Sequence, residues 1–151
     1  MVGKVTVIMK KQRKTFAEIA GDFAGKPSSE HHYDDVNGYS CLGFCFALYR
    51  KLGKDFPSEW DGMTLADYND KYVVGSPEAY EKLLEFARTV GKEVRPYEAV
   101  AGDFIIVKDK AGYIYPGVCA GNGSIMCCLE TCGIKTFNTF GRIEILAARR
   151  L

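Results

Sequence analysis

The feature that most constrains the fold is a change of hydrophobic periodicity near residue 100. Up to about residue 91 apolar side chains recur at helical spacing, whereas from residue 102 onward short apolar runs alternate with turn sequences such as Gly121-Asn122-Gly123. Helices followed by hairpin-connected strands are typical of an α+β domain. We therefore predict N-terminal helices and then an antiparallel β-meander of about five strands, at residues 104–107, 113–120, 124–129, 134–137 and 142–147.

Helix termination signals place three helices before the strands. Thr15 followed by Glu18 forms a capping box, and Ser76-Pro77-Glu78 combines an N-cap serine, a proline at the first helical position and an acidic first turn. The predicted helices cover residues 15–24, 40–52 and 77–90, with one further turn near Leu65 to Tyr68. In the second helix, one buried stripe is expected to hold Cys41, Cys45, Leu48 and Leu52.

Length and composition predict one domain with a sizeable core. The chain has 151 residues, of which 47% are hydrophobic, and its formal net charge is +1. This balance gives no broad electrostatic reason to expect nucleic acid or an anionic membrane as a partner. We expect residues 1–14 to be an arm or short strand, in which Val2 to Met9 could pair with a partner's sheet edge, and residues 15–151 to be a single domain. The basic run at residues 10–14 is interpreted as a solvated turn or a protein docking contact.

No segment has the pattern of a signal peptide or of a membrane span. We therefore expect synthesis in the cytoplasm and no membrane insertion. The six cysteines are then expected to be reduced thiols. There is no Cys-x-x-Cys pair, and the adjacent Cys127 and Cys128 would point to opposite faces of a strand, so we expect no metal and no other cofactor.

Cys41 is the candidate nucleophile because it lies at the start of a predicted helix. Amide dipoles at a helix N-terminus stabilise a thiolate, but a reactive cysteine also needs a base or a positive neighbour. The chain has only two histidines, His31 and His32, in the polar loop before Cys41. Two interpretations remain open: Cys41 is a small core residue, or one of these histidines folds over it as a base.

Several sequence pieces in order resemble one family. They are Ala24-Gly25-Lys26-Pro27, Ser40-Cys41-Leu42-Gly43-Phe44 with the run from Ala47 to Pro57, Ala101-Gly102-Asp103-Phe104, and Gly117-Val118-Cys119-Ala120-Gly121-Asn122-Gly123. Together they resemble the NlpC-type papain-like peptidases that cleave cell-wall peptides, and specifically the compact members found in phage tail tips. The resemblance runs from about Ala17 to the C-terminus. It implies a papain-like NlpC-type fold, with Cys41 at the position of the nucleophile and Ser40 and His32 beside the substrate cleft.

The departures from this family concern its catalytic set. Tyr115 occupies the position of the family's histidine, Cys127 that of its polar orienting residue, and Ser40 that of the aspartate before the nucleophile. The ordinary pKa of tyrosine is near 10, so Tyr115 is a poor proton acceptor at neutral pH. General base catalysis typically contributes ~10²–10⁴ in rate. The resemblance therefore implies a catalytically degenerate member.

The leading hypothesis is a structural component of a phage or phage-like tail tip, incorporated in the virion and contacting other tail-tip or assembly proteins. The alternatives are an active cell-wall peptidase or amidase that uses Cys41 with an altered base, and a non-cleaving binder of murein peptides. Trp60 is either an exposed interface anchor or a loop aromatic that packs onto the domain.

Overall fold

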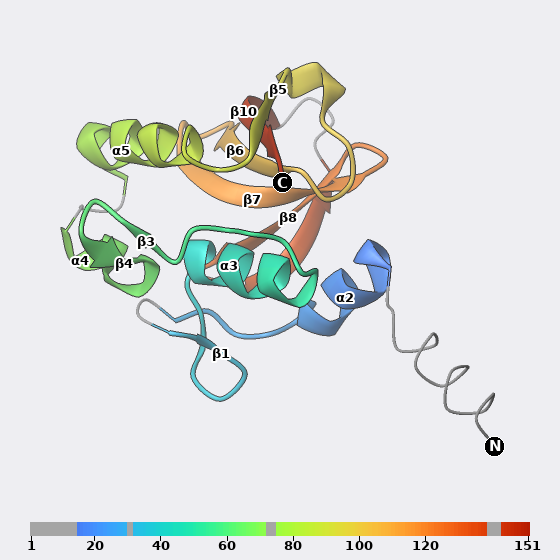
Figure 1. Ribbon diagram of the computed structural model, residues 1–151, viewed down its shortest axis with the longest axis horizontal. Helices are drawn as coiled ribbons and strands as arrows, with labels where there is room; N and C mark the ends of the chain where they lie inside the picture. Colours follow the sequence, from blue (N-terminus) through green and yellow to red (C-terminus); the bar gives the residue numbers. More distant parts are fainter. Residues whose placement is uncertain (1–14, 30–31, 72–74, 139–142) are drawn as a thin grey trace.

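The computed structural model describes residues 15–29, 32–71, 75–138 and 143–151. The predicted arm at residues 1–14 and His31 lie outside this part of the chain. The helices lie against a six-stranded antiparallel sheet, and the described strands also form two separate two-stranded sheets (Figure 1). The helix-then-strand order confirms the α+β class predicted from the periodicity.

The helices begin where the capping signals place them. Helix α2 covers Phe16–Phe23, and Thr15 Oγ1 accepts the Glu18 N–H as its N-cap. Helix α3 covers Cys41–Lys51 and is capped by Ser40, and α5 covers Pro77–Ala87. Between α3 and α5 the chain forms the hairpin β3–β4 (Glu59–Trp60 and Met63–Thr64), the 3-10 turn η1 (Leu65–Asp67) and the short helix α4 (Tyr68–Lys71).

The main sheet has the strand order β5-β10-β6-β7-β8-β9. Its strands are β5 (Lys92–Val94), β6 (Phe104–Asp109), β7 (Ile114–Gly121), β8 (Ser124–Leu129), β9 (Gly133–Asn138) and β10 (Ile143–Arg150). The expected meander runs from β6 to β9. The last strand then crosses back to pair with β6 instead of β9, and it carries the edge strand β5, which the sequence analysis did not predict.

The two faces of this sheet carry different clusters of apolar residues, because side chains alternate along each strand. The helix-side cluster joins α2, α3 and α5 to Phe104, Ile106 and Cys128. The second cluster contains Ile105, Val107 and Cys127 from the same strands, together with apolar residues of β5 and β10. Cys127 and Cys128 thus belong to opposite faces, as the sequence predicts.

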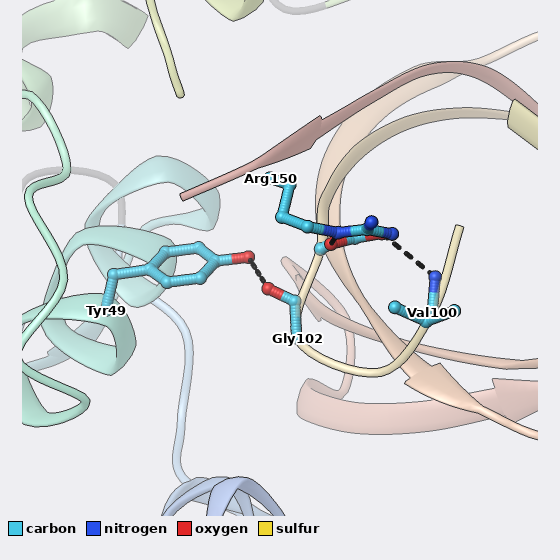
Figure 2. A network of polar contacts seen from close by, with 5 residues as sticks. Tyr49, Val100, Gly102 and Arg150 are labelled. Atoms are coloured by element: carbon cyan, nitrogen blue, oxygen red, sulfur yellow. Dashed lines mark hydrogen bonds and ion pairs between the residues drawn. The ribbon is translucent and has the colours of Figure 1, made fainter. Parts of the chain in front are cut away.

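An ion pair between buried Asp103 and half-exposed Arg150 joins the start of β6 to the end of β10. Arg150 Nε and Nη2 donate to Asp103 Oδ1 and Oδ2 at 2.9 and 2.8 Å, and the Val100 N–H donates to Asp103 Oδ2 at 2.9 Å. Figure 2 shows this network beside Tyr49 of α3, whose O–H donates to the Gly102 carbonyl at 2.7 Å. The helix that carries Cys41 is therefore tied directly to the turn before β6.

Replacing Asp103 with alanine should destabilise the fold by about 2–3 kcal/mol, because Asp103 is 2% exposed and its loss leaves the Val100 amide and the Arg150 guanidinium without their acceptor. Urea unfolding measures the loss. The control is Glu85→Ala, which removes an exposed ion pair with Lys82 and should change stability by less than ~0.5 kcal/mol. Equal losses in the two variants would contradict a structural role for the Asp103–Arg150 pair.

Candidate active site

Cys41 is the first residue of α3, and Ser40 fixes the start of that helix. Ser40 is buried, and its Oγ accepts the Gly43 N–H at 3.0 Å. Serine and aspartate are comparably good N-caps, so Ser40 supplies the helix start that an aspartate would give at this position. The sequence prediction that Cys41 begins the helix is confirmed.

The thiol of Cys41 is held in its protonated form. The backbone N–H groups of Cys41 and Leu42 favour the thiolate, as expected at a helix N-terminus. Burial outweighs them and raises the pKa of Cys41 to about 11, although part of the residue reaches the surface. The net effect is opposite to the lowering that a helix N-terminus alone would give.

Replacing Ser40 with alanine should lower the free energy of unfolding by about 1 kcal/mol, because the Gly43 amide then loses its acceptor at the buried end of α3. Ser40→Asp keeps an acceptor and should retain most of that stability. The thermal unfolding midpoints of the two variants measure the difference. A Ser40→Ala protein as stable as the wild type would show that the cap contributes nothing to the site.

Cys127 belongs to the second cluster, on the sheet face opposite the helix-side cluster of α3, and it carries no basic group. Burial raises its pKa well above the ordinary value, and the charge of an ionised Cys41 raises it further. Its side chain occupies the space beside Gly117 on the neighbouring strand, where an added Cβ would lie 2.6 Å from Cys127 Sγ. Cys127 therefore packs as a core residue at the position of the family's polar residue.

Tyr115 lies on β7 opposite Val107 of β6 and packs against the second cluster. Burial raises the pKa of Tyr115 to about 12, and the charges of Cys127 and Asp109 add to this. The hydroxyl is therefore neutral at physiological pH and is a poor general base. Tyr115 and Cys127 thus share the second cluster, on the sheet face opposite the one that packs on α3, and neither is a proton acceptor at neutral pH.

His32 lies near this helix start through its backbone. The Ser40 N–H donates to the His32 carbonyl at 2.8 Å. The imidazole is exposed, and its Nδ1 forms a hydrogen bond with Ser29 Oγ at 2.8 Å. The backbone of His32 thus contacts the residue before Cys41, whereas its imidazole bonds to Ser29.

Tyr39 is a residue of this region that the sequence analysis missed. It is 3% exposed, and its O–H donates to Asp35 Oδ1 at 2.5 Å. The Cys128 S–H donates to the Tyr39 carbonyl at 3.1 Å. The available signal was the turn sequence from Asp34 to Gly38, in which Asp34 Oδ1 accepts two backbone N–H groups.

Other predicted features lie away from Cys41. Trp60 packs edge-to-face on Phe86 at 5.9 Å between ring centroids, with Lys82 Nζ 5.9 Å from its ring, so it is tucked onto the domain. Two surface hollows of about 750 and 370 Å³ meet at Asp55, beyond the C-terminal end of α3, and neither is lined by Cys41, Tyr115 or Cys127.

All six cysteines are free thiols. Within the described ranges no group of three or more His, Cys, Asp or Glu residues is arranged to hold a metal ion. No helix in the same part of the chain has the length and hydrophobicity needed to cross a membrane.

Comparison with known proteins relates the chain to others by structure alone. No protein-family model matches the sequence, and no curated protein matches it. One similar solved structure is the NlpC/p60 domain of the peptidoglycan hydrolase SagA, with a TM-score of 0.58 and 17% identity over 90% of this chain and 96% of that one.

A second similar structure is a lipoprotein-like protein of the NLP/P60 family from Staphylococcus aureus subsp. aureus Mu50. Its TM-score is 0.55 at 15% identity, and the alignment covers 89% of this chain but only 39% of that one. At these identities the likeness concerns the fold, which agrees with the fold expected from the sequence resemblance. The chain has the α+β papain-like fold of NlpC/p60 domains.

Proposed function

We propose that this protein is a structural component of a phage or phage-like tail tip, built on an NlpC-type fold that no longer carries out peptidase chemistry. The loss of chemistry rests on one observation above all: desolvation raises the pKa of the Cys41 thiol to about 11, so the thiol is protonated at neutral pH. The strand positions that should supply its base and orienting group hold Tyr115 and Cys127, whose pKa values are also raised.

The tail-tip role is supported by the sequence pieces that resemble the compact phage members of the family. Its partners would be neighbouring tail-tip or assembly proteins, and its final location would be the virion. The formal net charge of +1 gives no broad electrostatic reason to expect nucleic acid as a partner.

Analysis of assembled particles tests the structural role. Particles purified from the producing host should contain the protein in a fixed ratio to other tail proteins. A Cys41→Ala variant should be incorporated at the same ratio, because the thiol is not used. Absence of the protein from mature particles would contradict the proposal.

A peptidase with a relocated base is the second candidate, because the backbone of His32 bonds the Ser40 amide and so holds a histidine near the start of α3. In that case His32→Gln and Cys41→Ala would each abolish cleavage of murein peptides. The third candidate is a protein that binds wall peptides without cleaving them. It would show saturable peptide binding and no product, both as the wild type and as the Cys41→Ala variant.

A further inference from the structure

The two surface hollows that share Asp55 form one groove beyond the C-terminal end of α3, called here the Asp55 groove. The larger hollow, of about 750 Å³, is lined by the segment after α3, by β5 and by the end of β10. The smaller hollow, of about 370 Å³, extends from Asp55 to Phe46 of α3. Volumes of this order are typical of ligand sites. Arg50 of the groove and Cys41 lie at opposite ends of α3, about 14 Å apart along the helix axis, so the groove is separate from the candidate active site.

Basic side chains line both parts of the Asp55 groove. Arg50 and Lys54 line the smaller hollow, and Lys92 and Arg150 line the larger one. In the strand register Lys92 of β5 is directly opposite Arg150 of β10. Like charges at directly opposite positions of a sheet repel each other. An acidic group bound in the larger hollow would therefore relieve this repulsion.

Most of these cations have no acidic partner within the described part of the chain. Arg150 is paired with Asp103, whereas Arg50, Lys54 and Lys92 take part in no ion pair among the described residues. Three basic groups of the groove are thus available to a bound acidic partner.

Two acidic side chains, Asp55 and Glu93, also line the groove. Glu93 is directly opposite Arg149 in the strand register, so it has a basic cross-strand neighbour of its own. The groove therefore keeps an excess of basic groups. Phe46, Pro57 and Val94 add apolar contact surface to the same groove. This combination suits a polypeptide segment that carries both carboxylates and small apolar side chains.

We propose that the Asp55 groove binds an acidic segment of a neighbouring protein, with Arg50, Lys54 and Lys92 as the groups that recognise its carboxylates. Complementary charge identifies the partner segment and orients it on the groove. The inference rests on the proposed function in taking a protein of the same particle as the source of the segment. The presence of the protein in particles tests that function, whereas binding by the purified protein tests the groove.

Fluorescence anisotropy with the purified protein and a labelled short peptide of alternating glutamate and alanine tests the groove. In the control peptide glutamine replaces glutamate, and labelled oligothymidylate shows whether any polyanion is bound. Arg50→Gln and Lys92→Gln each remove one charge, from the smaller and from the larger hollow. The matched control is Lys110→Gln, which removes the same charge from an exposed lysine in the turn between β6 and β7.

The acidic peptide should bind saturably, and each groove variant should raise its Kd about fivefold, as expected when one surface ion pair is lost. Lys110→Gln should change the Kd by less than about twofold, and the glutamine peptide should not bind. Absence of binding to the wild type would overturn the groove. Equal weakening by the groove and control variants would also overturn it, because the attraction would then follow net charge alone. Oligothymidylate that binds as tightly as the acidic peptide would overturn the assignment to a protein partner.

Discussion

Alkylation of Cys41 at pH 7 should be about 100-fold slower than that of an unperturbed cysteine, because its pKa is about 11 instead of 9.0. Only the thiolate reacts, and each unit by which the pKa is raised lowers the thiolate fraction about tenfold.

The raised pKa of Cys41 also predicts how its alkylation rate depends on pH. The Cys41 rate should increase tenfold for each pH unit above 7 and level off only near pH 11. Iodoacetamide, a short cysteine peptide as reference and site-resolved mass spectrometry measure it. A plateau that begins near pH 6 would mean that a positive neighbour stabilises the thiolate, and the inert site would be contradicted.

Replacing Gly133 with alanine should destabilise the fold by about 3 kcal/mol or more, through backbone strain together with a close contact. Gly133 has a φ of +70°, and an added Cβ would lie 2.3 Å from the Lys26 carbonyl oxygen. That carbonyl accepts the Ile134 N–H at 2.9 Å, so the segment after α2 cannot move away without breaking its contact with β9.

The Gly112→Ala variant is the control that separates the cost of backbone strain from the cost of the close contact at Gly133. Gly112 also has a positive φ, of +93°, but nothing lies within 4 Å of an added Cβ. It should therefore lose only about 1 kcal/mol, from backbone strain. Urea unfolding of both variants gives the comparison. Equal losses would show that the close approach of Lys26 to β9 contributes nothing.

Local signals predicted the elements whose ends are set by single residues. The caps at Thr15 and Ser76 placed the starts of α2 and α5, since a side-chain acceptor for backbone amides is a property of the sequence itself. The hairpin at Gly121-Asn122-Gly123 was also predicted from local sequence, because glycine and asparagine accept the positive φ that a tight turn needs. Asn122 indeed has a φ of +53°.

Pairing between distant residues could not be predicted in this way. Strand β5 is short and largely exposed, so its sequence has no strand periodicity, and it is a strand only because β10 pairs with it. The return of β10 to β6 likewise depends on the whole sheet.

The candidate site shows the same limit. The amino-acid sequence placed Cys41 at a helix start. The direction in which the pKa of Cys41 shifts, however, depends on burial by residues distant in sequence. The hydrogen bond from Cys128 to Tyr39 joins residues 89 positions apart. Chemistry set by such contacts becomes visible only in the folded protein.

Cleavage of murein peptides tests the central claim most directly. Wild-type protein and Cys41→Ala should be incubated with defined wall peptides under single-turnover conditions, and the products followed by mass spectrometry. We expect no product above the level of the variant, because a protonated Cys41 has no base at Tyr115 or Cys127. Product formation by the wild type that is lost in Cys41→Ala would show that the fold is still a working peptidase.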